Sequence, residues 1–185
     1  MKKLLCVLLF VAGCGEIEDD FKIVSVDSSE SAIHSWGGYH WRSDHLSPTV
    51  YNKTPSTLYD VSGTVLKWSS LNTPIQPAMS LDRKADISVS ESSSIFWLGI
   101  ATIYLDSSGH IVKGDVKLNT RLLKKYSPAV AAHVLCQELG HIWGLDHNEV
   151  DTDTCMNDLT AVSSPWLYPN AHDTEELNLI YNHTD

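Results

Sequence analysis

Apolar and polar residues along the chain form two kinds of pattern, which separate expected strands from expected helices. Short runs with the alternation and residue types of a half-buried strand predict β structure. Four such runs are present, at 40–50, 86–89, 100–105 and 111–118. Ser107, Ser108 and Gly109 separate the last two runs and predict a turn between neighbouring strands.

A helix is predicted to begin near Pro55, because proline after Thr54 suits the first helical position. Its apolar stripe reaches about residue 70 and consists of Leu58, Val61, Val65 and Leu66 or Trp68. Strands and helices alternate along the chain, which favours an α+β fold with a mixed, twisted sheet backed by two long helices. A small helical subdomain is expected at the C-terminus. The segment from 36 to 185, roughly 150 residues, is enough for one hydrophobic core.

The second predicted helix, 128–143, carries the most specific pattern in the chain. Ser127 is a good N-cap and Pro128 a good first helical residue. The end of this helix and the residues after it read QELGHIWGLDH, from Gln137 to His147. This sequence matches the zinc-peptidase signature H-E-x-x-H-x-x-G-x-x-H at every position except the first.

The spacing of this motif predicts a metal centre. Positions 137 and 141 lie four apart, so Gln137 and His141 share one helix face and can bind one ion. Gly144 accepts the positive φ of a helix C-cap, which lets the chain turn back and bring His147 to the same ion. Glu138 lies beside that face and is predicted to act as general base toward the attacking water.

Glutamine at position 137 leaves two interpretations open. The Gln137 oxygen is as many bonds from Cα as the distal nitrogen of histidine, so its reach is similar. An amide oxygen is a poorer zinc donor than imidazole and sits on a flexible side chain, so zinc affinity is expected to fall. Glutamine and histidine are both neutral ligands, so the exchange would leave the zinc ion's ability to acidify a bound water intact. In the alternative the site is dead, and the protein binds a partner without cutting it.

Two lysines and a short apolar run, 4–11, open the chain, and Val-Ala-Gly-Cys at 11–14 resembles the lipobox of a bacterial lipoprotein signal. The run is too short to span a bilayer. Residues 1–13 are therefore interpreted as a cleaved export signal and Cys14 as the lipidated first residue, with an ordinary secretory signal as the alternative. The mature protein is expected to be exported, either anchored in the cell envelope or periplasm or released outside the cell.

Residues 14–35 are rich in acids and serines and poor in apolar residues, which predicts a flexible tether. The mature chain carries 23 acidic residues against 11 Lys and Arg, because the signal removes two of the 13 basic residues. This balance argues against nucleic acid or an anionic membrane surface as a partner. The expected membrane link is the lipid, and the domain is expected to be a monomer.

The chain from about Trp36 onward resembles the bacterial matrixin-like metallopeptidases of the metzincin clan. The segment 96–120 is similar to the paired strands before the active-site helix, 154–158 (TCMND) to the Met-turn, and 169–181 to the C-terminal helix. Some bacterial members carry Cys-Gln-Glu at the start of the motif, as residues 136–138 do here.

This resemblance implies a zinc-dependent metalloendopeptidase in which Met156 forms the floor beneath the metal. A protein or peptide substrate would bind extended, as an added strand along 96–105. Family members often bind structural Ca²⁺ as well. Four acids follow the motif closely: Asp146, Glu149, Asp151 and Asp153. Their spacing does not match an EF-hand loop, so a solvated acidic loop is expected, with calcium as the alternative.

Export changes the role expected of the cysteines. Cys6 leaves with the signal and Cys14 is modified, so Cys136 and Cys155 remain and are expected to form a disulfide. The competing idea is that Cys136 is a metal ligand. That position points about 100° away from the face of Gln137, which argues against ligation.

Two other histidines lie close to the motif in sequence. His133 is one turn before Gln137, and a surface or packing role is expected for it. His172 stands at the start of the C-terminal helix. It is expected to be a neighbour of the helix cap, with a substitute metal ligand or a partner of a ligand as the alternative.

Two functions therefore remain open from the sequence. The first is a lipid-anchored zinc endopeptidase with Glu138 as its catalytic residue. The second is a catalytically silent, peptidase-like binding lipoprotein that has kept the cleft for a partner. The two functions predict different effects of Gln137→His. In a peptidase it should tighten zinc binding and raise proteolysis, whereas in a silent binding protein it should gain nothing.

Overall fold

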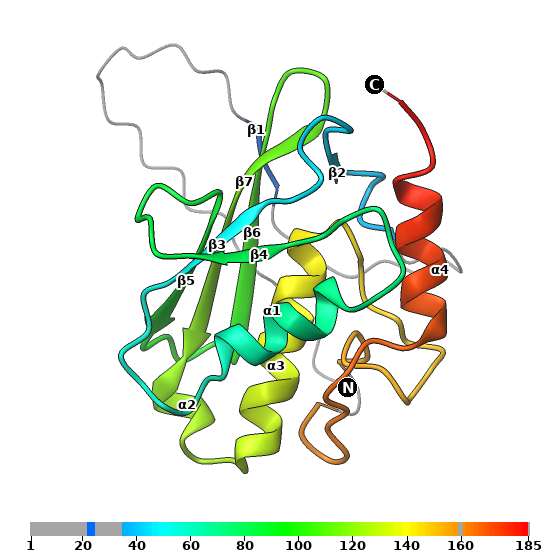
Figure 1. Cartoon of the computed structure of the whole chain (residues 1–185). Coiled ribbons are helices and arrows are strands. Elements are labelled where there is room, and N and C mark those ends of the chain that lie inside the picture. The colour runs from blue at the N-terminus through cyan, green and yellow to red at the C-terminus, as the bar shows by residue number, and fades with distance from the viewer. Residues whose placement is uncertain (1–21, 25–34, 159–160, 185) are drawn as a thin grey trace.

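The computed structural model of the chain describes residues 22–24, 35–158 and 161–184. Its strands are β1 (Lys22–Val24), β2 (His40–Trp41), β3 (Thr49–Asn52), β4 (Ala78–Ser80), β5 (Ile87–Ser92), β6 (Gly99–Leu105) and β7 (His110–Asn119). They form one sheet in the order β1-β6-β7-β5-β3-β4, with β2 paired to β7 (Figure 1). The predicted signal, 1–13, and the predicted lipidation site, Cys14, lie outside the described residues. Strand β1 falls within the predicted tether, 14–35.

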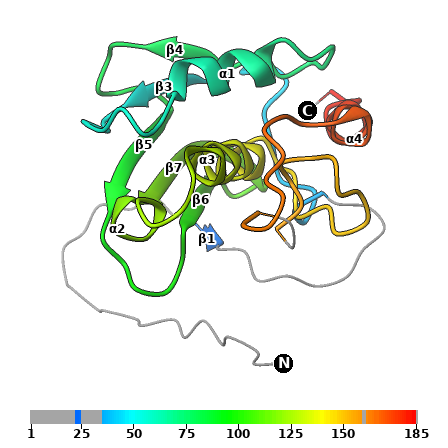
Figure 2. The same ribbon diagram turned by 90° about the horizontal axis from the view of Figure 1, so that it is seen from below.

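The helices are α1 (Val61–Ser69), α2 (Thr120–Leu123), α3 (Pro128–Ile142) and α4 (Ala171–Ile180). The sheet is mixed, because β6 is antiparallel to β7 and to β1, whereas β2, β3, β4 and β5 make parallel pairs. Viewed from below, the twisted sheet curves around α3, and α4 lies farther from the sheet (Figure 2). The expected α+β architecture is confirmed. In the described part of the chain, no helix is both long and apolar enough to span a bilayer.

The strands at 86–89, 100–105 and 111–118 are present as β5, β6 and β7, each slightly longer than predicted. The single strand expected at 40–50 is wrong. Two short strands occur instead, because β2 pairs with the start of β7 whereas β3 pairs with β4 and β5. Strand β4 and the short helix α2 were not predicted.

Helix α1 begins after Asp60, not at Pro55. The backbone before it is fixed by side chains, since the Thr54 N–H donates to Asn52 Oδ1 at 2.8 Å and the Ser56 N–H to Glu91 Oε1 at 3.1 Å. The Asp60 carboxylate accepts the Gly63 N–H at 2.8 Å and caps the helix. The first backbone N–H groups of a helix need an acceptor outside the helix, and the Asp60 carboxylate provides one. The helix therefore begins directly after Asp60.

Asp60→Ala is expected to lower the free energy of unfolding by about 1 kcal/mol, the usual value of a lost N-cap. The measurement is urea denaturation of both proteins. Asp44→Ala is the matched control, because Asp44 pairs with Arg42 in an exposed ion pair that contributes little. Equal losses in the two variants would contradict the assigned cap.

Buried tryptophans hold α3 in place. The Trp68 indole N–H, on α1, donates to the Cys136 carbonyl at 3.2 Å, and the Trp41 indole N–H, on β2, donates to the Ile142 carbonyl at 2.9 Å. Both side chains are almost fully buried. Helix α3 therefore has a fixed rotation, and the face that carries the zinc-peptidase motif is directed away from the tryptophans toward β6.

Candidate active site

Helix α3 ends as the sequence predicts, and its ending redirects the chain toward the site. Gly144 has φ +100°, and its N–H donates to the His141 carbonyl while the Leu145 N–H donates to the Gly140 carbonyl. These two bonds form a Schellman motif. A Cβ at position 144 would overlap the Tyr39 carbonyl, so both the positive φ and the close approach require glycine here.

The turn brings His147 back against His141. Their Nε2 atoms lie 3.2 Å apart. The Nδ1 of His141 lies 2.8 Å from the Leu145 carbonyl, which can only accept a hydrogen bond, so Nδ1 carries the proton and Nε2 presents its lone pair. Two zinc–nitrogen bonds of about 2.05 Å at a tetrahedral angle place the nitrogens about 3.3 Å apart. The two imidazoles therefore fit one zinc ion.

Gln137 lies on the same face, one turn before His141, and its side chain is buried. Its amide nitrogen is buried and has no hydrogen-bond partner among the described residues. The amide, His141 and His147 all line one pocket. Among the described residues no three His, Cys, Asp or Glu side chains are arranged to hold an ion. A metal centre with three protein ligands here therefore needs the Gln137 amide.

Glu138, the next residue on α3, also lines this pocket. It is buried, and this burial raises the pKa of its carboxyl to about 8, partly opposed by a hydrogen bond from the Ala101 backbone. A Cβ at Gly99 would overlap Glu138 Oε1, so the glycine leaves the space that the carboxylate occupies. The sequence analysis did not identify Gly99, although a glycine in a strand often marks such a close approach.

The pocket has a volume of about 280 Å³ and lies between β6, α3 and the segment after the Met-turn. Leu98, Val134, Ala161 and Val162 supply apolar walls, and Asp158 adds one carboxylate. The space is suited to an aliphatic side chain placed next to the histidine pair.

Met156 packs directly under the part of α3 that carries Gln137 and His141. It is fully buried, and a Cβ at Gly140, the residue before His141, would overlap its sulfur. The predicted disulfide between Cys136 and Cys155 is present. It joins the helix to the segment that carries Met156, so both sides of the site are covalently tied.

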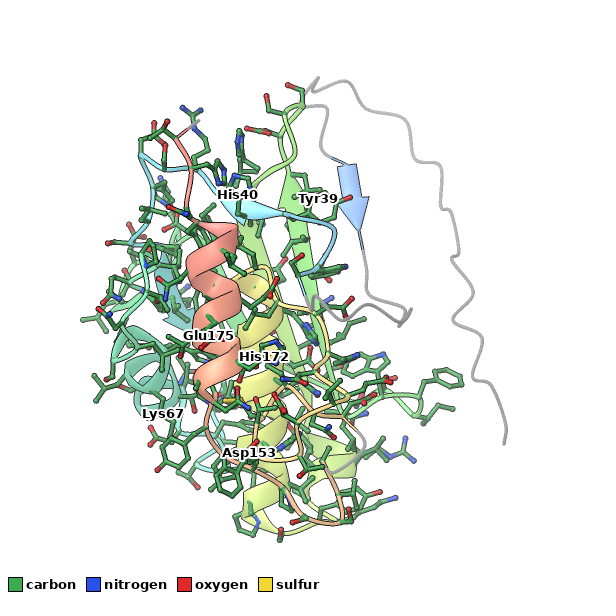
Figure 3. All side chains as sticks on the ribbon, turned by 90° about the vertical axis from the view of Figure 1, so that its right-hand side faces the viewer. Tyr39, His40, Lys67, Asp153, His172 and Glu175 are labelled. Atoms are coloured by element: carbon green, nitrogen blue, oxygen red, sulfur yellow. A yellow bond between two sulfur atoms is a disulfide. The ribbon has the colours of Figure 1, made fainter. Side chains whose placement is uncertain are left out.

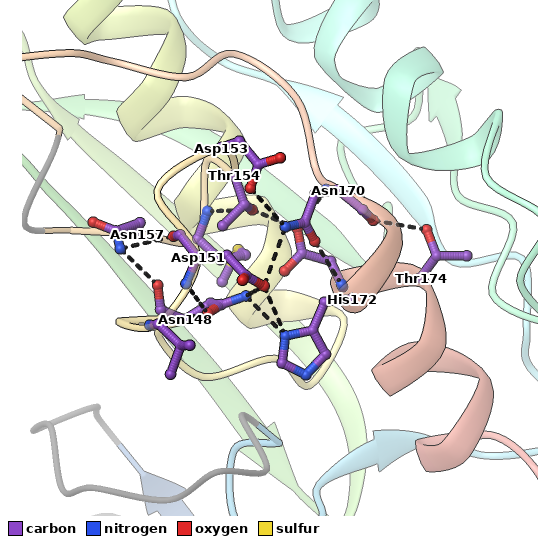
Figure 4. A network of polar contacts seen from close by, with 11 residues as sticks. Asn148, Asp151, Asp153, Thr154, Asn157, Asn170, His172 and Thr174 are labelled. Atoms are coloured by element: carbon purple, nitrogen blue, oxygen red, sulfur yellow. Dashed lines mark hydrogen bonds and ion pairs between the residues drawn. The ribbon is translucent and has the colours of Figure 1, made fainter.

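A polar network, drawn in Figure 4, supports the segment that follows His147. The Asn157 side-chain amide donates to the carbonyls of Asn148 and Asp151, each at 2.9 Å, and the Asn148 N–H donates to the Met156 carbonyl at 2.9 Å. These hydrogen bonds join residues 154–158 to the segment after His147. Neither asparagine was singled out from the sequence, because an isolated asparagine in a loop carries no motif.

His172 belongs to this network and not to the pocket lining. Its Nδ1 lies 2.9 Å from Asp151 Oδ2, and Asn170, the cap of α4, also donates to Asp151. Hydrogen bonds from Asn148, and then from His172, hold the pKa of the Asp151 carboxyl below its usual value. This is the position expected of a neighbour of the helix cap. Asp153 accepts from Asn170 as well.

His133 is fully buried, so a surface role is wrong and a packing role is correct. Its Nδ1 lies 2.8 Å from the Trp166 carbonyl, and burial lowers its pKa. The neutral ring thereby anchors the segment after the Met-turn to α3.

Comparison with known proteins agrees with this fold. No family model and no curated protein matches the chain. The fold is a mixed, metzincin-like α+β fold. Myroilysin, a metalloprotease, is a solved structure of similar fold: the TM-score is 0.54 at 11% identity, over 82% of this chain and 99% of that one. At this identity the likeness establishes the fold alone.

Proposed function

We propose that this protein is a zinc-dependent metalloendopeptidase, a matrixin-like variant with glutamine as its first ligand. The observation that carries the proposal is the convergence of His141 Nε2 and His147 Nε2 at 3.2 Å, with the Leu145 carbonyl fixing the tautomer of His141. A carbonyl on the outer nitrogen of a ligand is the usual support in metal sites. Gln137 completes a set of three neutral ligands on one side of the pocket.

Zinc, when bound, supplies a Lewis acid that makes a water more acidic and polarises a peptide carbonyl. The chain's own residues transfer the proton and hold the substrate. Glu138 takes the proton of the attacking water and later gives it to the leaving amine. A group whose pKa lies near neutrality can do both, and burial moves the Glu138 pKa in that direction. The apolar wall of the pocket holds a substrate side chain and excludes water from the reacting centre.

The edge of β6 next to the pocket is available to an extended peptide. β1 pairs with residues 103–105 of β6, and within the described residues no strand pairs with 99–101 on that side. Ala101 and Gly99 border the pocket. A substrate could add to the sheet as a strand along residues 99–101. In that position it would pass in front of His141 and His147.

Zinc content after dialysis tests the proposal. The purified protein is expected to retain about one zinc per chain, and His141→Ala is expected to retain almost none, because it removes one of three ligands. His45→Ala is the matched control, since His45 pairs with Asp86 on the surface. Equal zinc in wild type and His141→Ala, or none in either, would remove the basis of the proposal.

One observation favours a second function, a catalytically silent binding protein. The residue at position 137 is an amide, which binds zinc more weakly than imidazole. In that case the pocket and the β6 edge hold a peptide without cleaving it. Measured zinc binding together with hydrolysis of a denatured protein substrate would exclude this alternative.

Location outside the cytosol forms part of the proposal. The disulfide between Cys136 and Cys155 is typical of oxidising compartments. The lipobox-like Val-Ala-Gly-Cys at 11–14 supports a lipid anchor on Cys14, which mass spectrometry of the membrane fraction would detect as a mass increase lost in Cys14→Ser.

A further inference from the structure

Three histidines from separate elements gather near the C-terminal end of α4. His40 lies in β2, His110 at the start of β7 and His183 just after α4. The ring centroids of His40 and His183 are 4.3 Å apart, and those of His40 and His110 are 5.0 Å apart. Figure 3 shows His40 at the end of α4 opposite to His172 and Asp153, so this cluster is separate from the polar network beside the Met-turn.

His40 occupies the centre of this cluster, and its tautomer is fixed. Its Nδ1 lies 2.9 Å from the Gly38 carbonyl, which can only accept, so Nδ1 carries the proton and Nε2 has the lone pair. The Nδ1 of His110 lies 3.3 Å from a carboxylate oxygen of Asp106, which has the same consequence for the neutral ring. Carbonyl and carboxylate partners on the outer nitrogen are the supports found behind metal-binding histidines.

The inner nitrogens of His40 and His183 converge. Their Nε2 atoms are 2.8 Å apart, and the two rings meet at nearly a right angle. Two metal–nitrogen bonds of about 2.05 Å at the right angle of a tetragonal Cu(II) or Ni(II) site separate the nitrogens by about 2.9 Å, whereas the tetrahedral angle of zinc separates them by about 3.3 Å. The observed spacing therefore fits two imidazoles on a tetragonal ion better than on zinc.

We propose that His40 and His183 bind one divalent transition-metal ion that accepts imidazoles at a right angle, nickel(II) or copper(II). Among residues 22–24, 35–158 and 161–184, no third His, Cys, Asp or Glu is at ligand spacing, so His40 and His183 are the two ligands that this part of the chain supplies. His110 is the adjacent imidazole. The ion ties the end of the chain after α4 to β2, and so to the sheet. This site is independent of the proposed peptidase centre.

A different arrangement of the same atoms is a hydrogen bond between two neutral imidazoles, in which His183 Nε2–H donates to His40 Nε2. It needs no ion and predicts no metal affinity. The two arrangements therefore differ in a measurable quantity, the binding of nickel at a second site.

Calorimetric titration of the whole, metal-free protein with nickel chloride tests the site, because nickel(II) binds imidazoles and accepts right-angle coordination. Wild type is expected to bind two ions, and His183→Ala to lose the weaker of the two events by at least about 10-fold in affinity. His141→Ala is expected to lose only the tighter event, and His45→Ala neither. His183 is exposed at the chain end, so its replacement leaves the fold intact.

A second event that is absent from wild type, or that is unchanged in His183→Ala, would overturn the proposal and leave the hydrogen-bonded pair. The outcome for His141→Ala is read from the other event, so failure of this site and failure of the peptidase centre are distinguished in one set of titrations. Nickel is also expected to raise the melting temperature of His141→Ala but not of the double variant His141→Ala/His183→Ala.

Discussion

Glu138→Gln is expected to lower the rate of peptide hydrolysis by about 10²- to 10⁴-fold, the usual contribution of a general acid–base residue. The amide has nearly the shape of the carboxylate, so it fits the space that Gly99 leaves beside Oε1. It cannot accept the proton of a water. Zinc content is expected to stay at the wild-type value, because Glu138 is not among the proposed ligands. The measurement is kcat/KM on a denatured protein substrate, with zinc determined in the same preparation.

Glu176→Gln provides a matched control for this substitution. Glu176 is also buried, but it lies on α4 and does not line the pocket. Its replacement tests the general cost of neutralising a buried carboxylate. Undiminished hydrolysis in Glu138→Gln would show that a different group moves the proton. A wild-type protein that binds zinc but cleaves nothing would support the silent binding protein instead.

The site elements that could be predicted from the sequence are those with local signals. Helix α3 is an example, because its N-cap, its first-turn proline and Gly144 all lie within a few residues of its ends. The convergence of His141 and His147 follows from the same short segment, since a Schellman ending reverses the chain within two residues. The disulfide could be predicted by counting the cysteines that would remain once the predicted signal is removed.

The features that were missed depend on contacts distant in sequence. Asn52 and Glu91 hold the backbone where Pro55 suggests a helix start, and Glu91 lies on another strand. The short strand β4 exists only through its pairing with β3. Gly99 matters because α3 approaches β6 there; a glycine in a strand indicates a close approach, but the helix that approaches is distant in sequence. Tertiary contacts decided each of these positions.

The packing around position 137 explains why glutamine is compatible with a metal site. Trp68 and the disulfide fix the rotation and position of α3 from the side opposite to the pocket, and neither contact involves the residue at 137. The geometry of His141 and His147 is likewise set by Gly144 and Leu145. The residue at position 137 can therefore change its chemical type while His141 and His147 keep their places. Its replacement should alter the affinity for the ion more than the fold.

Gln137→His is expected to tighten zinc binding by at least the roughly 10- to 100-fold that a single supporting contact contributes in metal sites. The new imidazole supplies a stronger donor and loses less side-chain freedom on binding than the amide does. If the protein is a peptidase, hydrolysis at limiting zinc is expected to rise with the occupied fraction. The measurements are zinc affinity by competition with a chromogenic chelator, and hydrolysis rate across a series of free zinc concentrations.

Gln76→His serves as the control, because Gln76 is exposed and its amide binds only backbone carbonyls. It should change neither zinc affinity nor hydrolysis. Unchanged zinc affinity in Gln137→His would mean that residue 137 does not contact the ion and that His141 and His147 act without it. Tighter zinc binding without any gain in hydrolysis would locate the defect beyond the metal ligands, which is the behaviour expected of a pocket that has been kept for binding alone.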